Sequence, residues 1–98
     1  KLPAPYVSGV VKDTLAIILL DQEFSGSNIF AYNENGNLVW KVQRHTFTIE
    51  IPGFQILEVD NDFLQAYCRD TWFKIHPKTG ILISEWSDRG GLVILNEN

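Results

Sequence analysis

Short apolar runs alternate with polar turns along the whole chain. The runs are rich in β-branched and aromatic residues, and glycine, proline, asparagine or aspartate interrupts them about every eight to twelve residues. No stretch keeps apolar residues at spacings of three and four long enough for an amphipathic helix. The pattern therefore predicts an all-β fold, an antiparallel meander of about eight to nine strands that forms one domain over residues 1–98.

The expected strands follow from the position of each run. We expect them near 6–11, 14–20, 28–32, 38–42, 47–51, 54–59, 63–68, 71–76 and 81–86, with a further short strand at 92–95. The strand at 47–51 depends on the alternating TFTIEI, which an extended loop edge would also show. The run LAIILL is apolar at every position, which is typical of a central strand covered on both faces.

One hairpin pattern occurs twice, in NIFAYNENGNLVWKV and in TWFKIHPKTGILISEW. Each copy has an aromatic strand, a polar turn that ends in glycine, and a second strand with a tryptophan. Aligning Gly36 with Gly80 brings Phe30 over Phe73 when one residue is inserted in the second turn. Another hairpin precedes each copy, so the chain contains an internal pseudo-repeat of two four-stranded units, at about 6–42 and 54–86.

The stretches FAYNENGNLVW and FKIHPKTGILISEW resemble the repeat of β-propellers of the pyrroloquinoline-quinone (PQQ) type, with an aromatic strand, a D-x-x-T-G turn and a Leu-x-Trp strand. The resemblance implies two propeller-blade-like units that form a curled sheet, a sandwich or a barrel. Propellers use about four to eight blades, so neither ring closure nor the quinone carries over. The chain also resembles small uncharacterised bacterial proteins, some carried on mobile gene cassettes, and this implies no activity.

Alternation along the strands leaves apolar side chains on two faces. In 71–76, Phe73 and Ile75 share one face, and Trp72, Lys74 and His76 share the other. A single flat sheet would leave the second apolar face in water, which is uncommon for a monomer. We expect the sheet to curl over this face, or a second copy or a protein partner to cover it.

Charge and composition exclude several classes of partner. The net charge is −4 and the pI about 4.9, which excludes nucleic acid as a main partner, because phosphate contacts need clustered lysine and arginine. The longest apolar run is far shorter than the roughly 20 residues that span a bilayer, so we expect no membrane partner. One cysteine favours a reducing, cytoplasmic compartment, while a secreted protein without disulfides and with its signal peptide cleaved would show the same pattern. Because the chain begins at Lys1, we expect that its natural start was removed.

No set of residues with catalytic or metal-binding spacing is found. Cys68, His45 or His76, and Asp70 could act as nucleophile, base and orienting acid, but Cys68 shares its strand face with apolar residues and is expected to be a core residue. The acidic stretch EVDND lacks the glycine and the distal glutamate of a calcium loop, and it is simply explained as a turn. We therefore expect no enzyme, no metal and no cofactor.

The tryptophans are the remaining candidates for function. We expect Trp40 and Trp86 to join the core. Trp72 is the one to test as a contact with a partner or ligand, although core packing is favoured over that role, because aromatic strand residues mostly pack. The candidate binding residues are Tyr67, Trp72, Lys74 and His76. Two functions stay open: a non-catalytic β-sheet interaction module that binds itself or a protein partner, and a small-molecule-binding protein or minor enzyme with a pocket near Trp72, His76, Tyr67 and Cys68.

Overall fold

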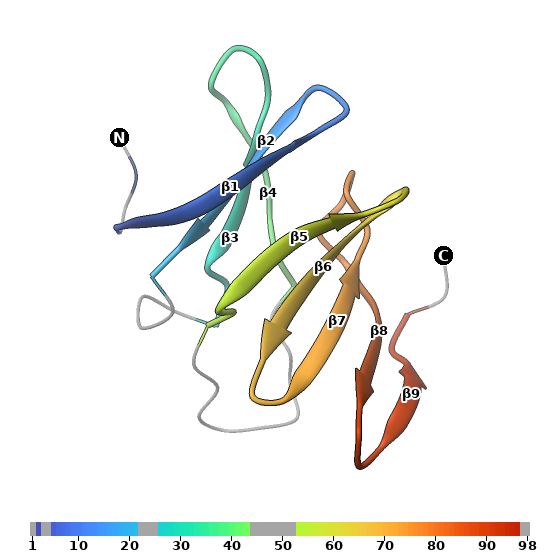
Figure 1. Ribbon diagram of the computed structural model, residues 1–98. Helices are drawn as coiled ribbons and strands as arrows, with labels where there is room; N and C mark the ends of the chain where they lie inside the picture. The colour runs from blue at the N-terminus through green and yellow to red at the C-terminus, as the bar shows by residue number, and fades with distance from the viewer. Residues whose placement is uncertain (1, 3–4, 22–25, 44–52, 97–98) are drawn as a thin grey trace.

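Strands and turns make up the regular structure that the computed structural model describes, which covers residues 2, 5–21, 26–43 and 53–96 (Figure 1). This part contains nine antiparallel strands and no helix, so the all-β prediction is confirmed. The strands are β1 (Tyr6–Lys12), β2 (Leu15–Leu20), β3 (Ile29–Tyr32), β4 (Leu38–Lys41), β5 (Ile56–Asp60), β6 (Phe63–Cys68), β7 (Thr71–Ile75), β8 (Leu82–Ser87) and β9 (Gly91–Ile94). Their ends lie within two residues of the predicted ones. The strand predicted at 47–51 lies outside the described residues.

The nine strands form two sheets in chain order. The first sheet has the order β1-β2-β3-β4, and the second has the order β5-β6-β7-β8-β9. The described strands close neither a barrel nor a propeller ring. β1 and β5 lie side by side where the two sheets meet (Figure 1). The division into sheets falls between the two units of the pseudo-repeat.

The two repeated hairpins share their turn geometry. Gly36 and Gly80 both have a positive φ, of 81° and 75°. The Oδ1 atom of Asn33 accepts hydrogen bonds from the N–H groups of Asn35 and Asn37, and Nδ1 of His76 accepts one from the N–H of Lys78. Each hairpin also carries a register shift, between residues 31 and 32 in the first copy and between 74 and 75 in the second.

One core lies between the sheets. Its buried side chains come from both units: Ile17, Leu19, Ile29, Ala31, Trp40, Val42, Phe54, Leu57, Leu64, Ala66, Cys68, Phe73, Ile75 and Leu82. β2, which carries LAIILL, is an inner strand of the first sheet, as predicted. Of its six residues, Ile17, Leu19 and Leu20 are buried and the other three are half-buried. The core therefore joins the two units into one packed body.

Trp40 links the first sheet to a turn of the second sheet through a hydrogen bond and a packing contact. Its Nε1–H donates a hydrogen bond of 2.9 Å to the carbonyl oxygen of Pro77, and its ring lies against Gly80. A Cβ atom added to Gly80 would lie 2.5 Å from Cε3 of Trp40. Next along the chain, the N–H of Gln43 donates to the carbonyl oxygen of Gly80 at 2.9 Å. The prediction that Trp40 joins the core is confirmed.

Asn28 is a buried polar link between the units that sequence analysis did not find. Its Nδ2 donates to the carbonyl oxygens of Leu20 and Phe54, both at 2.8 Å, and its Oδ1 accepts from the N–H of Phe54 at 2.7 Å. The side chain is fully buried. Because burial of an amide is costly unless it is hydrogen-bonded, these three bonds make the position specific for asparagine.

The prediction that Trp86 joins the core is wrong. Trp86 is 48% exposed and lies opposite Trp72 in the cross-strand register, on the face of the second sheet that is turned away from the core. In a two-sheet body each sheet buries one face against the other, so β8 has one wet face. The alternation of β8 does not indicate which face that is.

Candidate functional site

A row of large apolar side chains crosses the outer face of the second sheet. The cross-strand register places one residue from each of the five strands in line, and these residues define the aromatic row: Ile56, Tyr67, Trp72, Trp86 and Leu92. Ile56 is 41% exposed and Leu92 65%, while Tyr67 and Trp72 are half-buried. Because neighbouring residues of a strand point to opposite faces, the next row contains Ala66 and Phe73 and faces the core.

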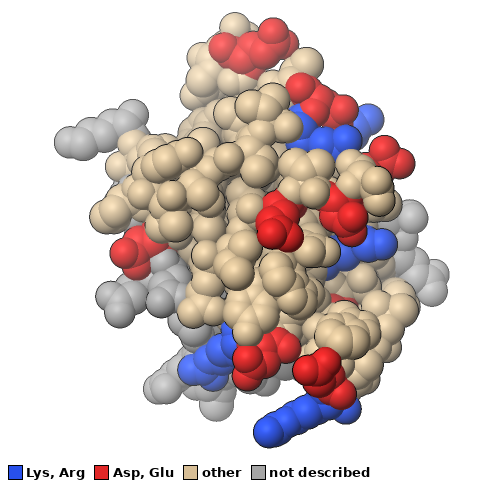
Figure 2. Space-filling view, viewed as in Figure 1, with Lys and Arg blue, Asp and Glu red and all other residues tan. Residues whose placement is uncertain are grey.

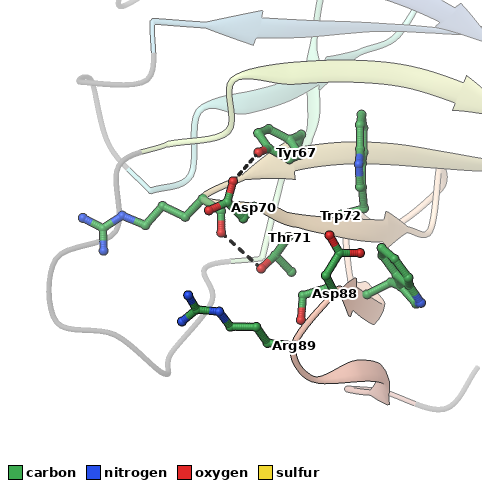
Figure 3. Close-up of a pocket in the computed structure, with 9 residues that line it drawn as sticks. Tyr67, Asp70, Thr71, Trp72, Asp88 and Arg89 are labelled. Carbon is green, nitrogen blue, oxygen red and sulfur yellow. Dashed lines mark hydrogen bonds between the residues drawn. The ribbon is translucent and has the colours of Figure 1, made fainter.

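The three middle residues of the aromatic row border a hollow formed by two turns, the turn hollow, with a volume of about 480 Å³ (Figure 3). The β6–β7 turn and the β8–β9 turn border it. Three aromatic residues of the row line it together with four charged residues from the turns: Arg69, Asp70, Asp88 and Arg89. The hollow therefore combines aromatic surface with both signs of charge.

Short-range contacts fix the side of the hollow formed by the β6–β7 turn. The rings of Tyr67 and Trp72 are 5.0 Å apart between centroids and tilted by 56°. The hydroxyl of Tyr67 donates a hydrogen bond of 2.8 Å to Oδ1 of Asp70 (Figure 3). This hydrogen bond to a carboxylate favours the protonated phenol and raises the pKa of Tyr67. Arg69 and Asp70 both have positive φ, the geometry of a tight type I′ turn.

The β8–β9 turn forms the opposite side of the hollow. The Oγ atom of Ser87 accepts a hydrogen bond of 3.0 Å from the N–H of Gly90, and Gly91 has a φ of 64°. Asp88 and Arg89 lie in this turn and are exposed. In Figure 3 the carboxylate of Asp88 is directed toward the strand that carries Trp72. The Asp88 carboxylate therefore faces the aromatic side of the hollow, whereas the Arg89 side chain extends away from Trp72 along the rim (Figure 3).

The four predicted binding residues share the outer face but not one pocket. Tyr67 and Trp72 meet at the turn hollow. Lys74 lies further along β7 with its Nζ 4.8 Å from the ring centroid of Phe63, and His76 lines a separate hollow of about 350 Å³. At about 3.3 Å per residue, His76 is roughly 13 Å from Trp72 along the strand. The structure therefore separates these residues into two places.

Cys68 lies away from both hollows. It is 5% exposed and belongs to the core between the sheets, on the opposite face from Tyr67 and Trp72. Burial raises the pKa of its thiol, so the neutral form dominates near neutral pH. Of the four residues of the predicted pocket, Tyr67 and Trp72 line the turn hollow, whereas His76 lines the smaller hollow and Cys68 lines neither. His45 lies outside the described residues.

Sequence analysis named Asp70 only as a candidate orienting acid for Cys68, and it missed Arg69, Asp88 and Arg89. Arg69-Asp70 and Asp88-Arg89 each pair a basic with an acidic residue in a turn, but turn residues are usually only solvated. The turns meet because β7 and β8 are neighbours with Thr71 opposite Ser87. This register depends on how the strands pair in the folded protein, and local sequence does not reveal it. A repeated Arg/Asp pair at two turns beside tryptophans was the signal available.

A second, smaller hollow among the described residues also combines an aromatic ring with both signs of charge, from Phe63, Lys12 and Asp13 among others, but it holds no tryptophan. In the described ranges no group of three or more His, Cys, Asp or Glu residues could hold a metal ion. On the face shown in Figure 2, acidic and basic side chains are scattered over a larger uncharged surface. No helix in the described part of the chain is long and apolar enough to cross a membrane.

The chain matches no protein-family model, and no curated protein or solved structure matches it significantly. The functional argument therefore depends on the geometry of this face.

Proposed function

We propose that the chain is a non-catalytic β-sheet interaction module that binds a protein surface through the aromatic row, a second copy of the chain being the simplest partner. The observation that carries this proposal is the exposure of the row. Trp86 is 48% and Leu92 65% exposed on one continuous line across the sheet. A contiguous exposed apolar patch is typical of interaction sites, and tryptophan and tyrosine are enriched among the residues that contribute most to binding.

The pseudo-repeat supports this use of the face. With Phe30 aligned to Phe73, the positions of Tyr67, Trp72 and Trp86 correspond to Leu19, Ile29 and Val42 of the first sheet. Those three residues are buried in the core that the first sheet shares with the second. The equivalent surface of the second sheet has the same apolar character but no sheet packed on it among the described strands. It is therefore suited to receive a partner.

The free energy available is large enough to decide association. At about 25 cal/mol per Å², covering 400 Å² of apolar surface would contribute about 10 kcal/mol before association costs. β9 adds an edge strand whose outer backbone groups have no strand partner among the described residues. Edge strands of this kind also accept a strand from another chain.

Light scattering after gel filtration tests this proposal. We expect a concentration-dependent increase in mass for the native chain, and a loss of that increase in Leu92→Ser. Val11→Ser is the matched control, because Val11 is 74% exposed on the first sheet, away from the aromatic row. A strict monomer at the highest attainable concentration would exclude the second copy as partner, and an equal effect of both variants would exclude the row.

The non-catalytic part of the proposal is supported by Cys68, whose buried neutral thiol is a poor nucleophile. We expect the native protein to react slowly with a chromogenic disulfide reagent near neutral pH, and the unfolded protein to react quickly. Rapid, pH-dependent labelling of the folded protein would instead favour an enzyme.

The same thiol predicts a pH dependence of stability. The native state keeps the thiol proton to a higher pH than the unfolded state, whose thiol has the ordinary pKa of 9.0. The contribution of this group is therefore fully present below pH 9 and is lost as the pH rises through the native pKa. Urea unfolding above pH 9 should show a shallower loss of stability for Cys68→Ala than for the native chain. Equal pH slopes would contradict the assignment.

A small-molecule-binding function is the alternative, and the turn hollow is the observation that favours it. A hollow of about 480 Å³ falls within the range of ligand sites, roughly 300–1,000 Å³. Intrinsic tryptophan fluorescence reports binding there, because Trp72 and Trp86 line the hollow. Of the sequence-predicted pocket residues, Tyr67 and Trp72 belong to this alternative, whereas His76 and Cys68 do not.

We also propose that the two units are blade-like, as the resemblance to propeller repeats implies. The shared turn geometry at Gly36 and Gly80 and the matching register shifts support this interpretation. A cytoplasmic location and the relation to small bacterial proteins remain proposals that depend on the sequence alone.

A further inference from the structure

The turn hollow offers rings with different degrees of exposure. Trp72 and Trp86 are cross-strand partners, and Tyr67 packs at a tilt against Trp72. The rings of Tyr67 and Trp72 are therefore half-buried. Trp86 remains 48% exposed. The face of an indole ring carries partial negative charge and attracts partly positive C–H groups. The floor of the hollow therefore favours a ligand with a C–H face rather than a purely polar one.

The charges around the hollow cancel. Arg69 and Arg89 supply two positive charges, and Asp70 and Asp88 supply two negative ones. Among the residues that the structure describes, no ion pair joins these arginines and aspartates. A phosphate or carboxylate ligand would meet two aspartates, and an ammonium ligand would meet two arginines. A neutral ligand avoids both repulsions.

The same four side chains can bind hydroxyl groups. Guanidinium groups only donate hydrogen bonds and carboxylates only accept them, whereas a hydroxyl does both. Asp70 accepts the Tyr67 hydroxyl through Oδ1, which leaves Oδ2 for a ligand. An arginine fork and the Asp88 carboxylate each offer two neighbouring hydrogen-bonding atoms, which match adjacent hydroxyls on a ring, whereas Asp70 offers one.

Both turns that border the hollow are held before any ligand binds. The Tyr67–Asp70 and Gly90–Ser87 hydrogen bonds fix one turn each. Arg69 has a φ of 49°, a conformation that costs a non-glycine residue about 1–2 kcal/mol. Residues held in this region are often found at functional sites. A preorganised site loses little conformational entropy on binding.

We propose that the turn hollow binds a neutral carbohydrate, with a pyranose ring stacked on Trp86 and its hydroxyls bound by Arg89, Asp88 and Asp70. The C–H face of a pyranose and its adjacent hydroxyls meet the two requirements of the site. The proposal names the ligand of the alternative function stated above, and it depends on the outer face of the second sheet being a binding surface.

Titration with cellotetraose, maltotetraose and chitotetraose tests the proposal, with tryptophan fluorescence and calorimetry as the two readouts. We expect at least one of these neutral oligosaccharides to bind. Trp86→Ala and Arg89→Ala should each weaken the binding about tenfold or more. Leu92→Ser is the matched control that should leave it unchanged, because Leu92 belongs to the aromatic row but not to the hollow. Circular dichroism checks that each variant is folded, and if Trp86→Ala is not, Arg89→Ala alone decides.

The proposal is overturned if none of the three sugars binds, if binding survives both hollow variants, or if inorganic phosphate binds in their place. Light scattering on the same variants separates this result from the proposed function. A loss of self-association in Leu92→Ser without any sugar binding leaves the interaction module standing and removes the carbohydrate site. Sugar binding by a chain that stays strictly monomeric would support the carbohydrate site and exclude the second copy as partner.

Discussion

At the scale of single residues, the lack of a side chain at Gly80 allows the two units to pack closely. Its positive φ suits the turn, and its lack of a Cβ lets the indole of Trp40 lie directly against the backbone. Gly36 occupies the same place in the first hairpin, with a similar φ but no atom within 4 Å of an added Cβ. Substitution of Gly36 therefore measures the free-energy cost of a side chain at positive φ alone, and substitution of Gly80 adds the cost of steric overlap with Trp40.

We predict that Gly80→Ala destabilises the protein much more than Gly36→Ala. Both substitutions place alanine at positive φ, which costs about 1–2 kcal/mol. At Gly80 the new methyl group also overlaps the ring of Trp40, which adds about 1–3 kcal/mol of overpacking. Urea unfolding of the two variants measures the difference, and equal losses would show that the Trp40 contact is unimportant.

The burial of individual tryptophans could not be predicted from the sequence. Trp40 and Trp86 both lie in the second strand of a repeated hairpin, and the same pattern predicted burial for both. Trp40 is buried because a turn of the second sheet lies against it. No described strand packs on Trp86 from outside its sheet. Residue type gives the preference for burial, and the neighbouring sheet decides whether it is satisfied.

At the scale of elements, the strands and hairpins could be predicted to within two residues. The reason is local: a period of two and turn-forming residues at each end require no knowledge of distant contacts. The β6–β7 turn departs from the local rule, since Arg69 takes a positive φ that asparagine or glycine would adopt at lower cost.

We therefore predict that Arg69→Asn stabilises the protein by about 1 kcal/mol, because asparagine tolerates the left-handed region better. Arg89→Asn is the matched control, since Arg89 is also an exposed arginine in a turn but lacks a positive φ. Its stability should change by less than about 0.5 kcal/mol. Urea unfolding checks both, and a loss of stability in Arg69→Asn would show that the arginine side chain itself supports the turn.

At the scale of the whole molecule, the two sheets depend on each other through a common core. Asn28 connects the end of β2 to Phe54 just before β5, and Trp40 connects β4 to the β7–β8 turn. The core cluster draws its buried residues from both sheets. We expect them to unfold together.

Asn28→Ala should lower the free energy of unfolding by about 3 kcal/mol or more, because it leaves the Leu20 carbonyl and both backbone groups of Phe54 buried without this partner. Asn37→Ala, at an exposed turn position, is the control and should change it by less than about 0.5 kcal/mol. Tryptophan fluorescence and circular dichroism should give one coincident transition in urea for the native chain. Two separate transitions would contradict the common core.

The sequence by itself determined the strands, the turns, the repeated hairpin and which residues share each strand face, because these depend on neighbours along the chain. Only the tertiary structure decided which face of each sheet is buried, that Asn28 and Gly80 hold the sheets together, and that two charged turns meet beside Trp72 and Trp86. These features depend on how two sheets pack, and alternation assigns residues to two faces without indicating which of them meets another sheet.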